Sequence, residues 1–429
     1  MNIFIEPSKD QWLEICKRPS GDNRSQSELV QTILSHVQSA GDQALREYAL
    51  NFDQVVLENL RVSQDEFESA WGYIDTRLKK AMHIAKANIE AFHSAQIPAE
   101  IKVETMPGVE CWQKAKPIER IGIYIPGGTA PLFSTVLMLA APAKMAGCKE
   151  IVICTPPQKD GSIHPAILCA AMMCDTKQVY KIGGAQAIAA MAFGTESVPQ
   201  VSKIFGPGNS FVTLAKMKVQ QHGTAIDMPA GPSEVLVWAD QWADPDFIAI
   251  DLLSQAEHGA DSQVILVAND KSLLEKVNAS MENLLKRLPR MEYAVKSLSH
   301  SGGIVLASEP DQIDFINQYA PEHLIIHCVD ADRLAETIQN AGSIFIGSFS
   351  PESVGDYASG TNHTLPTSAF AKSYSGVNLD SFMKKITYQK LSKEGLQNIG
   401  GYVETMAEAE QLEAHKLAVT IRLNKLNSI

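Results

Sequence analysis

The sequence predicts an α/β protein with at least two lobes built around parallel sheets. From residue 120 onward, short runs rich in β-branched residues alternate with glycine or proline turns and with alanine-rich helical stretches. This alternation is typical of βαβ units, whose strands are parallel. The chain has 429 residues, more than the roughly 250–300 at which a single hydrophobic core stops growing, so more than one lobe is expected.

The predicted elements follow the chain in three blocks. The first hundred residues are expected to be mostly helical, because apolar residues recur at helical spacing in 27–51 and 77–94. The next block contains three predicted strands, at 121–125, 151–154 and 179–182. A second series of strands is predicted at 235–238, 264–267, 303–307, 324–328 and 343–347. Strand signals fade after Tyr374, and 403–426 is expected to form a helical tail.

Bulk composition narrows the class of protein. The net charge of −12 and the lack of a Lys/Arg run argue against a nucleic-acid surface. Seven scattered cysteines without a CxxC pair are typical of reduced thiols in a cytoplasmic protein. The N-terminus has no basic region followed by an apolar stretch, so we expect no secretory signal. No apolar stretch reaches the ~20 residues of a membrane span.

Three glycine turns stand where predicted strands lead into helices. They are Tyr124-Ile-Pro-Gly-Gly, Gly183-Gly-Ala-Gln186 and Phe205-Gly-Pro-Gly-Asn209. Glycines at the carboxyl end of a strand let backbone amides and a helix N-terminus approach a phosphate. None completes G-x-G-x-x-G, since Phe211 takes the place of the third glycine in the closest. From the pattern alone, a dinucleotide site and ordinary βα turns are about equally supported.

Polar segments far apart in sequence carry groups able to bind a metal or transfer a proton. Gln255 and His258 share one face at the end of a predicted helix 245–258, where a buried hydrogen-bonding cluster is the commoner alternative. Glu322-His323 lies between a helix and a strand and is predicted to occupy a tight loop at a sheet edge. Its alternative is a capping glutamate beside a surface histidine.

Two further segments are weaker when taken alone. Asp356 and His363 flank a Gly/Ser/Thr/Asn-rich loop, for which an Asx turn is the alternative. His415 lies on a polar helix with Glu410 and Glu413 nearby, which by itself is typical of a solvated face. The remaining histidines lack such company and are expected to be structural or on the surface; they are His36, His83, His93, His164, His222, His300 and His327.

Taken together, these segments closely resemble the histidinol dehydrogenase family. The similar stretches are Tyr124-Ile-Pro-Gly-Gly, Gly183-Gly-Ala-Gln-Ala-Ile-Ala-Ala, Ile204-Phe-Gly-Pro-Gly-Asn, Ala225-Ile-Asp-Met-Pro-Ala-Gly-Pro-Ser-Glu-Val, Leu253-Ser-Gln-Ala-Glu-His-Gly, Gln318-Tyr-Ala-Pro-Glu-His-Leu and Gly355-Asp-Tyr-Ala-Ser-Gly-Thr-Asn-His. They run in the family's order over nearly the whole chain, which is far more specific than any single motif. The resemblance implies a zinc- and NAD-dependent enzyme that oxidises L-histidinol through the aldehyde to L-histidine, ending histidine biosynthesis.

The resemblance also implies roles for single residues. The ligands of one zinc ion per subunit would be Gln255, His258, Asp356 and His415. His323 would be the general base, and Glu322 would activate the water that hydrates the aldehyde. Substrate would contact the zinc ligands and the catalytic pair, and also Ser233, His363 and Glu410. NAD would contact Tyr124, Gln186 and Asn209. No carried-over position is substituted.

The implied architecture is aldehyde-dehydrogenase-like, with two incomplete Rossmann-like lobes on parallel sheets, a helical N-terminal arm and a C-terminal helical tail. We expect the arm at 1–20, the main lobe with zinc and catalytic residues at 21–123 plus 234–376, and the NAD-binding lobe at 124–233. The tail, 377–429, would cross to the partner subunit of a homodimer, so that Glu410 and His415 complete the neighbour's site. The arm and the loop 158–164 are expected to stay away from the chemistry.

Two other hypotheses remain. A zinc hydrolase using Glu322 as base would need no nucleotide site, which the three glycine turns disfavour. A catalytically silent relative would have no chemical need for Glu322, His323 and the four ligands.

Overall fold

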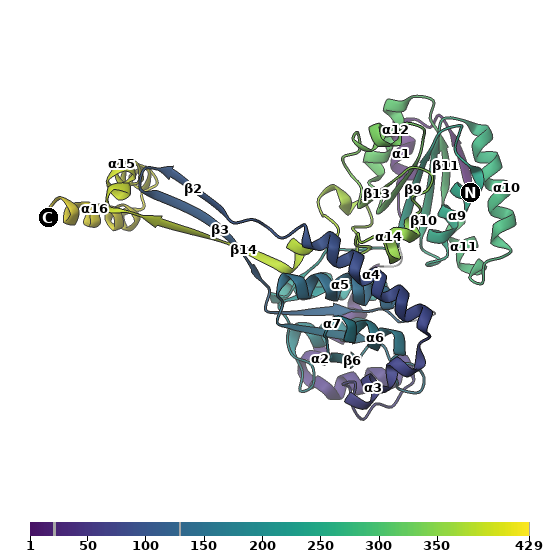
Figure 1. Ribbon diagram of the computed structural model, residues 1–429, viewed down its shortest axis with the longest axis horizontal. Coiled ribbons are helices and arrows are strands. Elements are labelled where there is room, and N and C mark those ends of the chain that lie inside the picture. Colours follow the sequence, from purple (N-terminus) through teal and green to yellow (C-terminus); the bar gives the residue numbers. More distant parts are fainter. Residues whose placement is uncertain (20–22, 128–129, 429) are drawn as a thin grey trace. The chain divides into compact units, whose positions relative to one another are not determined.

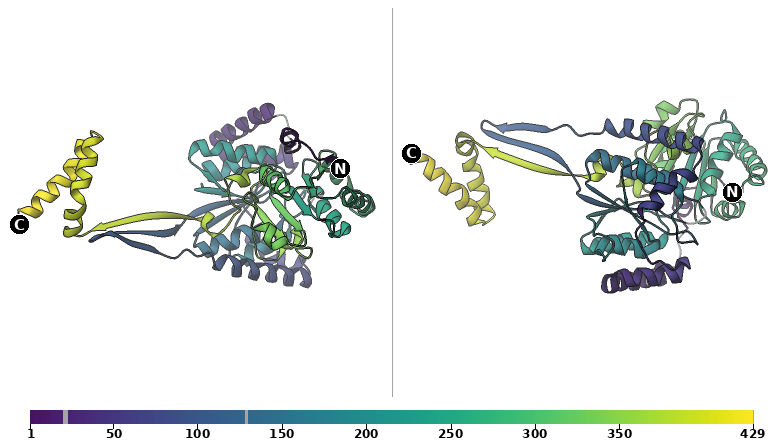
Figure 2. Two further views of the ribbon diagram at one scale, coloured as in Figure 1. Left: turned by 90° about the horizontal axis from the view of Figure 1, so that it is seen from above. Right: turned by 60° about the horizontal axis from the view of Figure 1, so that its bottom comes forward.

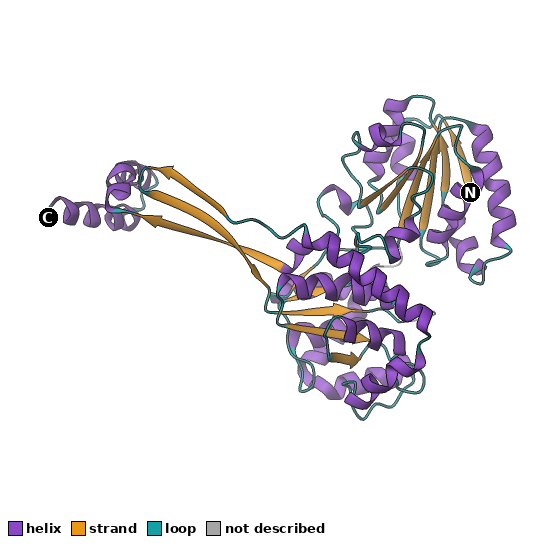
Figure 3. Ribbon diagram, viewed as in Figure 1, coloured by secondary structure: helices purple, strands orange, loops and turns teal. Residues whose placement is uncertain are grey.

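The computed structural model describes residues 1–19, 23–127 and 130–428, with the side chains of 23 and 24 left aside. These residues form two units: unit 1 comprises 1–96 and 118–381, and unit 2 comprises 97–117 and 382–428. Figure 1 labels many of the elements of both units, and Figure 3 separates strands from helices by colour. In the described part of the chain, no helix combines the length and apolar character needed to cross a membrane.

Unit 1 contains a six-stranded sheet in which every pair is parallel. Its order is β1 (Asn2–Ile5), β11 (Gly302–Val305), β10 (Gln263–Ala268), β9 (Glu234–Ala239), β12 (His323–His327) and β13 (Ser343–Ile346). The central strands β9 and β10 are buried along their whole length. The helices of this part are α1 (Lys9–Ile15), α9 (Pro245–Ala256), α10 (Lys271–Leu285), α11 (Met291–Leu298), α12 (Glu309–Tyr319), α13 (Ala331–Ala335) and α14 (Glu352–Tyr357).

A second parallel sheet in unit 1 has five strands. Its order is β6 (Gln178–Lys181), β5 (Glu150–Thr155), β4 (Arg120–Tyr124), β7 (Lys203–Phe205) and β8 (Ala225–Ile226). The helices are α2 (Asn23–Tyr48), η1 (Ala49–Asp53), α3 (Gln64–Tyr73), α4 (Thr76–Ser94), α5 (Phe133–Ala146), α6 (Pro165–Met173), α7 (Gly184–Phe193), α8 (Ser210–Val219) and η2 (Gln220–His222). Helix α2 packs on α7 and α8, whereas α4 packs on α5 and α5 on α6. Figure 2 accordingly shows α2 (purple) and α4 (blue) on opposite faces.

Unit 2 is an antiparallel sheet joined to a helical hairpin. The sheet order is β14 (Met383–Leu391), β3 (Val109–Pro117) and β2 (Ile101–Met106), and α15 (Lys393–Ala409) packs against α16 (Glu413–Asn427). Helix α16 has no buried residue. Two short 3-10 turns precede β14. The first, Phe370–Lys372, lies in unit 1, and the second, Leu379–Phe382, spans the boundary between unit 1 and unit 2.

The predicted α/β class with parallel sheets is confirmed, but several elements differ from expectation. Residues 23–94, assigned from sequence to the main lobe, pack through α2, α3 and α4 on helices of the five-stranded sheet. The expected loss of strands after Tyr374 is wrong, because β14 pairs along β3. The N-terminal arm is helical in α1 but also supplies the edge strand β1. These strands escaped prediction because their partners lie far away in sequence, and pairing decides strand formation more than local propensity.

Candidate active site

A cavity of about 880 Å³ opens at the carboxyl ends of strands of the five-stranded sheet. Tyr124 and Thr155, the last residues of β4 and β5, both line it. Gly127, Gly184 and Asn209 bring all three glycine turns to the same cavity. Asn209 caps α8 by accepting a hydrogen bond from the Val212 backbone N–H at 3.1 Å. The arrangement places helix N-termini beside the cavity, which favours an anionic ligand group.

The turn at Gly206 needs glycine for two reasons. Its φ of +116° is one that L side chains rarely adopt, and an added Cβ would lie 2.1 Å from the Tyr124 carbonyl oxygen. Asp227 accepts a hydrogen bond from the Gly206 N–H at 2.8 Å, and Lys216 donates to the Gly206 carbonyl at 2.8 Å. Lys216 and Asp227 also form a buried ion pair of 2.5 Å. The turn is therefore held on both sides by charged groups.

The three residues expected to contact NAD all line this cavity. The Tyr124 hydroxyl accepts a hydrogen bond from the Gly184 N–H at 3.0 Å, and burial raises the pKa of Tyr124 to about 12. Gln186 is buried beside it. Gln158 and Lys159, from the loop expected to stay clear of the chemistry, line the same cavity together with His164. This loop follows β5, so it lies at the carboxyl end of the sheet with the glycine turns.

A second constellation lies at the amino ends of strands in the six-stranded sheet. His323 is the first residue of β12, Glu322 precedes it, and both are buried. Strand β12 pairs with β9 on one side and β13 on the other, and His323 stands opposite Val235. The predicted position in a loop at the sheet edge is thus wrong: the strand is internal, although the pair does lie at a strand end. The surface-histidine alternative is wrong as well.

Backbone groups of Glu234 hold the Glu322–His323 pair. The Glu234 N–H donates to a Glu322 carboxylate oxygen at 2.9 Å, and its carbonyl oxygen lies 3.3 Å from Nδ1 of His323. A carbonyl only accepts, so Nδ1 carries the hydrogen of this bond. Among the described residues, Nε2 of His323 is buried without a hydrogen-bond partner, and it lies 3.6 Å from Asp356. Nε2 is therefore the nitrogen available to exchange a proton.

Helices α9 and α14 bring the metal-binding candidates together. Helix α9 begins with Asp244 as its cap and Pro245 at its first position, and it carries Gln255 in its last turn. It ends at Ala256, two residues before the predicted helical end, so His258 lies in the turn that follows. Ligand atoms of His258, Glu352 and Asp356 all lie within 4.8 Å of one another.

Glu352 is the site residue that the sequence reasoning missed. It is buried in the first turn of α14, four residues before Asp356 and hence on the same helical face. In the orientation that turns its amide nitrogen to Glu352, Gln255 donates to both carboxylate oxygens, at 2.5 and 3.2 Å. The Gln255 oxygen is then free to bind a cation. The i, i+4 spacing of Glu352 and Asp356 was the available signal.

Burial and mutual charge shift the titration of this cluster. Burial raises the pKa of Glu322 to about 8 and that of Glu352 to about 8, although His323 lowers both. Burial alone lowers the pKa of His323, but the surrounding carboxylates outweigh it and raise that pKa well above its ordinary value. For Asp356, burial acts to raise the pKa, but the nearby imidazoles hold it below its ordinary value. Desolvation lowers the pKa of His258.

The remaining predicted substrate contacts fall into two groups. His363 lies beside the cluster, because its Nδ1 is 3.0 Å from the Asp356 carbonyl oxygen and its Nε2 is 3.1 Å from the Thr135 hydroxyl. Ser233 directly precedes β9 and so stands next to Glu234. Glu410 caps α15 and His415 lies in α16, both exposed in unit 2. The structure thus gathers the unit 1 residues, and the roles of Glu410 and His415 stay predictions.

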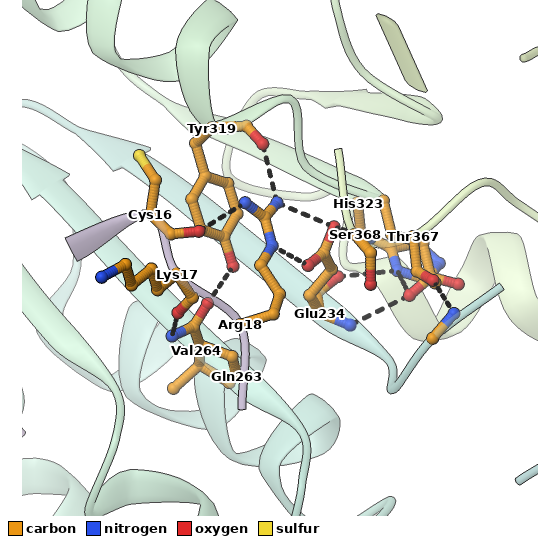
Figure 4. A network of polar contacts seen from close by, with 12 residues as sticks. Cys16, Lys17, Arg18, Glu234, Gln263, Val264, Tyr319, His323, Thr367 and Ser368 are labelled. Carbon is orange, nitrogen blue, oxygen red and sulfur yellow. Dashed lines mark hydrogen bonds and ion pairs between the residues drawn. The ribbon is translucent and has the colours of Figure 1, made fainter. Parts of the chain in front are cut away.

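The N-terminal arm, expected to stay away from the chemistry, contacts Glu234, whose backbone holds Glu322 and His323. Figure 4 shows Arg18 between Glu234 and Tyr319. Its guanidinium donates to the Glu234 carboxylate at 2.6 and 3.1 Å and lies 3.7 Å from the centre of the Tyr319 ring. Glu234 also accepts a hydrogen bond from the Ser368 N–H at 3.0 Å. Arg18 and Ser368 thereby fix the side chain of Glu234, the residue whose backbone holds Glu322 and His323.

Nitrogen and oxygen donors without a thiolate form a set typical of an exchangeable zinc or another divalent cation. The described cysteines are all free, as predicted, and none belongs to the cluster. Beside the cation candidates stand a buried imidazole and a buried carboxyl group able to move protons. The donor chemistry therefore fits a metal-assisted proton-transfer site.

Comparison with known proteins gives one consistent result. The family model described as "Histidinol dehydrogenase" matches residues 16–423. A histidinol dehydrogenase of Bacteroides thetaiotaomicron is 55% identical over 99% of this chain and 100% of its own length. One from Escherichia coli is 52% identical over 97% of this chain and 96% of its own length. The crystal structure of histidinol dehydrogenase from Elizabethkingia anophelis matches with a TM-score of 0.97 and 52% identity, covering 100% of this chain and 99% of the other.

Proposed function

We propose that this chain, which belongs to the histidinol dehydrogenase family of oxidoreductases, oxidises L-histidinol through L-histidinaldehyde to L-histidine with two NAD+. The reaction is the last step of histidine biosynthesis, and the chain acts first on an alcohol and then on an aldehyde. The observation that carries the proposal is the pairing of a buried base, His323, with a nearby nitrogen-and-oxygen cation cluster in a chain that also has a dinucleotide-sized cavity.

NAD is proposed to occupy the cavity of the five-stranded sheet. Its volume of about 880 Å³ lies within the roughly 300–1,000 Å³ range of ligand sites. Tyr124, Gln186 and Asn209 are the proposed contacts, and the glycine turns provide backbone N–H groups for the pyrophosphate. The cavity disfavours the zinc-hydrolase alternative, which has no use for such a site.

One zinc ion per subunit is proposed to be held by Gln255, His258, Asp356 and His415 of the partner subunit. When bound, it supplies positive charge that orients the imidazole and amine of histidinol and counters the effect of the carboxylates on the His323 pKa. Glu352 is proposed to hold the Gln255 amide so that its oxygen points to the ion. The same residues contact substrate through this arrangement.

In the first oxidation, Nε2 of His323 takes the hydroxyl proton of histidinol while a hydride passes from the carbinol carbon to NAD+. The hydrogen bond of Nδ1 to the Glu234 carbonyl keeps the ring in the tautomer with a basic Nε2. The products are the aldehyde, NADH and the proton on His323. Burial of the pair excludes bulk water from this transfer.

In the second oxidation, the Glu322 carboxylate takes a proton from the water that adds to the aldehyde carbon. The aldehyde oxygen takes up the proton that His323 holds, which completes the hydrate. Nε2 of His323 then takes a hydroxyl proton of the hydrate as a second hydride passes to a second NAD+, and the carboxylic acid that forms releases its proton to water to give the carboxylate of histidine. Glu322 must be ionised for this role, although burial raises its pKa to about 8. Ser233 and His363, with Glu410 of the partner subunit, are proposed to hold the substrate in both steps.

We also propose a homodimer with shared sites. Helix α16 has no buried residue, and unit 2 exposes large apolar side chains whose burial needs a partner. These side chains include Tyr402, Met406, Leu412, Leu417 and Ile421. The proposed location is the cytoplasm, with neither a nucleic acid nor a membrane as partner.

Mixed dimers test the sharing of sites. A His323→Asn chain combined with a His415→Asn chain should regain activity, because one site of each mixed dimer then has an intact His323 and an intact His415. Mixed samples no more active than the two separate variants would show that each site is built from one chain.

A further inference from the structure

Asp53 lines the cavity of the five-stranded sheet, at a place that no motif of the chain marks. It is the last residue of η1, the π-helical turn that continues α2. Leu29, Ile33 and Phe52 line the cavity as well, and Leu29 and Phe52 remain substantially exposed. Among the described residues, α2 and η1 thus contribute both apolar side chains and the Asp53 carboxylate to the cavity lining.

The Asp53 carboxylate lacks a compensating group within the protein. Burial alone raises its pKa, to about 6, and within residues 1–19, 23–127 and 130–428 no hydrogen bond or cation counters that shift. Asp53 also stands at the C-terminal end of a helical segment, where the helix dipole disfavours a negative charge. A carboxylate kept in such surroundings beside a cavity is a candidate for binding a ligand.

The position of Asp53 identifies which part of the cofactor it meets. Helix α5 approaches the catalytic cluster, because its Thr135 contacts His363 at 3.1 Å. The nicotinamide must lie toward that cluster to accept hydride. Helix α2 instead packs on α7 and α8, on the sheet face opposite α4 and α5 (Figure 2). The region around Asp53 is therefore left for the other end of the dinucleotide, the adenosine.

We propose that the Asp53 carboxylate accepts hydrogen bonds from the hydroxyl groups of the adenosine ribose and thereby selects NAD over NADP. The proposal rests on the proposed binding of NAD in this cavity. The apolar wall of Leu29, Ile33 and Phe52 suits the flat adenine ring. A carboxylate accepts from a ribose diol but repels the 2′-phosphate of NADP. Here the carboxylate comes from the end of η1 and not from a strand of the sheet, so no sequence fingerprint reveals it.

Lys159 could allow NADP to bind once the Asp53 carboxylate is removed. It lines the same cavity and is a cation able to pair with a 2′-phosphate once the competing carboxylate is removed. Asp53→Asn should therefore weaken NAD binding and leave NADP binding unchanged or stronger. The matched control is Glu58→Gln, which also removes one negative charge, five positions further on, at an exposed residue outside the cavity.

Calorimetric titration of the full-length, zinc-loaded protein tests the proposal with three probes: NAD, NADP and an NAD analogue lacking the 2′-hydroxyl of the adenosine ribose. The wild type should bind NAD at least about tenfold more tightly than either other probe, the effect of a hydrogen bond to a charged group. In Asp53→Asn, both preferences should shrink by about tenfold, whereas Glu58→Gln should keep them.

Equal preferences in wild type and Asp53→Asn would overturn the assignment of Asp53 while leaving NAD binding intact. A wild type that discriminates against neither NADP nor the deoxy analogue would overturn it without relying on any variant. Absence of NAD binding by the wild type would contradict the proposed function itself, and the two failures are thus distinguishable.

Discussion

The two parallel sheets of unit 1 carry their polar sites at opposite ends of their strands. In the five-stranded sheet, the cavity lies at the carboxyl ends, after Tyr124 and Thr155, where helices begin. In the six-stranded sheet, Glu322 and His323 stand at the amino end of β12, near the last turn of α9. Helix N-termini favour anions and helix C-termini favour cations. The carboxyl-end cavity therefore suits an anionic group, and the amino-end cluster suits a cation.

The largest effect is expected at the amino-end site. His323→Asn should lower kcat for both histidinol and histidinaldehyde by about 100- to 10,000-fold, because it removes the proposed base of both oxidations. Glu322→Gln should slow mainly aldehyde oxidation. The matched control is His327→Asn at the other end of β12, whose His327 pairs with Asp251 at 2.8 Å and should affect stability more than rate. Equal losses on both substrates for Glu322→Gln would contradict the division of roles.

A glycine pair tests the carboxyl-end site. Gly206→Ala combines a positive φ with a Cβ only 2.1 Å from a backbone oxygen, so the turn must shift and NAD binding should weaken by about tenfold or more. Gly223→Ala has a φ of +92° but meets nothing within 4 Å, and should cost only about 1 kcal/mol of stability. NAD titration and thermal unfolding distinguish them. If both variants bind NAD with similar affinity, the Gly206 turn does not determine the shape of the NAD cavity.

Glu352→Gln tests the proposed zinc site in the six-stranded sheet. It weakens the acceptor that orients Gln255, so zinc affinity should fall by about 10- to 100-fold, with NAD affinity unchanged. Competition with a chromophoric chelator measures the zinc Kd directly. Glu257→Gln, a nearby carboxylate outside the cluster, is the control. Unchanged zinc affinity in a correctly folded Glu352→Gln protein would show that Glu352 does not orient Gln255.

The raised pKa of Glu322 predicts a pH limb for the aldehyde step. Only the ionised carboxylate accepts a proton from water, so histidinaldehyde turnover should rise with pH up to about 8. The slope below that pH should approach about tenfold per unit. Glu322→Gln should flatten this limb. A profile with the same limb in that variant would assign it to another group.

The smallest effect concerns stability at the carboxyl-end site. The pKa of Asp53 is raised to about 6 in the folded protein, so the folded state binds more protons between its unfolded value near 4 and pH 6. Wild-type stability should fall as pH rises through that window. Asp53→Asn should therefore be more stable by about 1 kcal/mol at pH 7, after allowance for solvent screening, and equal near pH 4. Denaturant unfolding at both pH values measures this, and a destabilised variant at pH 7 would contradict an unpaired carboxylate.

Local chemistry explains which site residues could be predicted. Gly206 and His323 occupy positions whose backbone geometry or acid–base role demands one residue type, so their motifs are visible in a single chain. Glu352 has no motif, because its role depends on the orientation of the Gln255 amide. Asp53 lies at the end of a helix whose place beside the cavity is set by packing of α2 on α7 and α8. Long-range packing likewise placed β14 and the arm residue Arg18.

The proposed reaction is tested most directly by the yield of NADH from limiting L-histidinol, measured by absorbance with zinc-loaded protein, after chelation, and after zinc is restored. We expect two NADH per histidinol, loss of turnover on chelation without loss of NAD binding, and recovery with zinc. A yield of one NADH or none from zinc-loaded protein, or full turnover after the metal is removed, would contradict it.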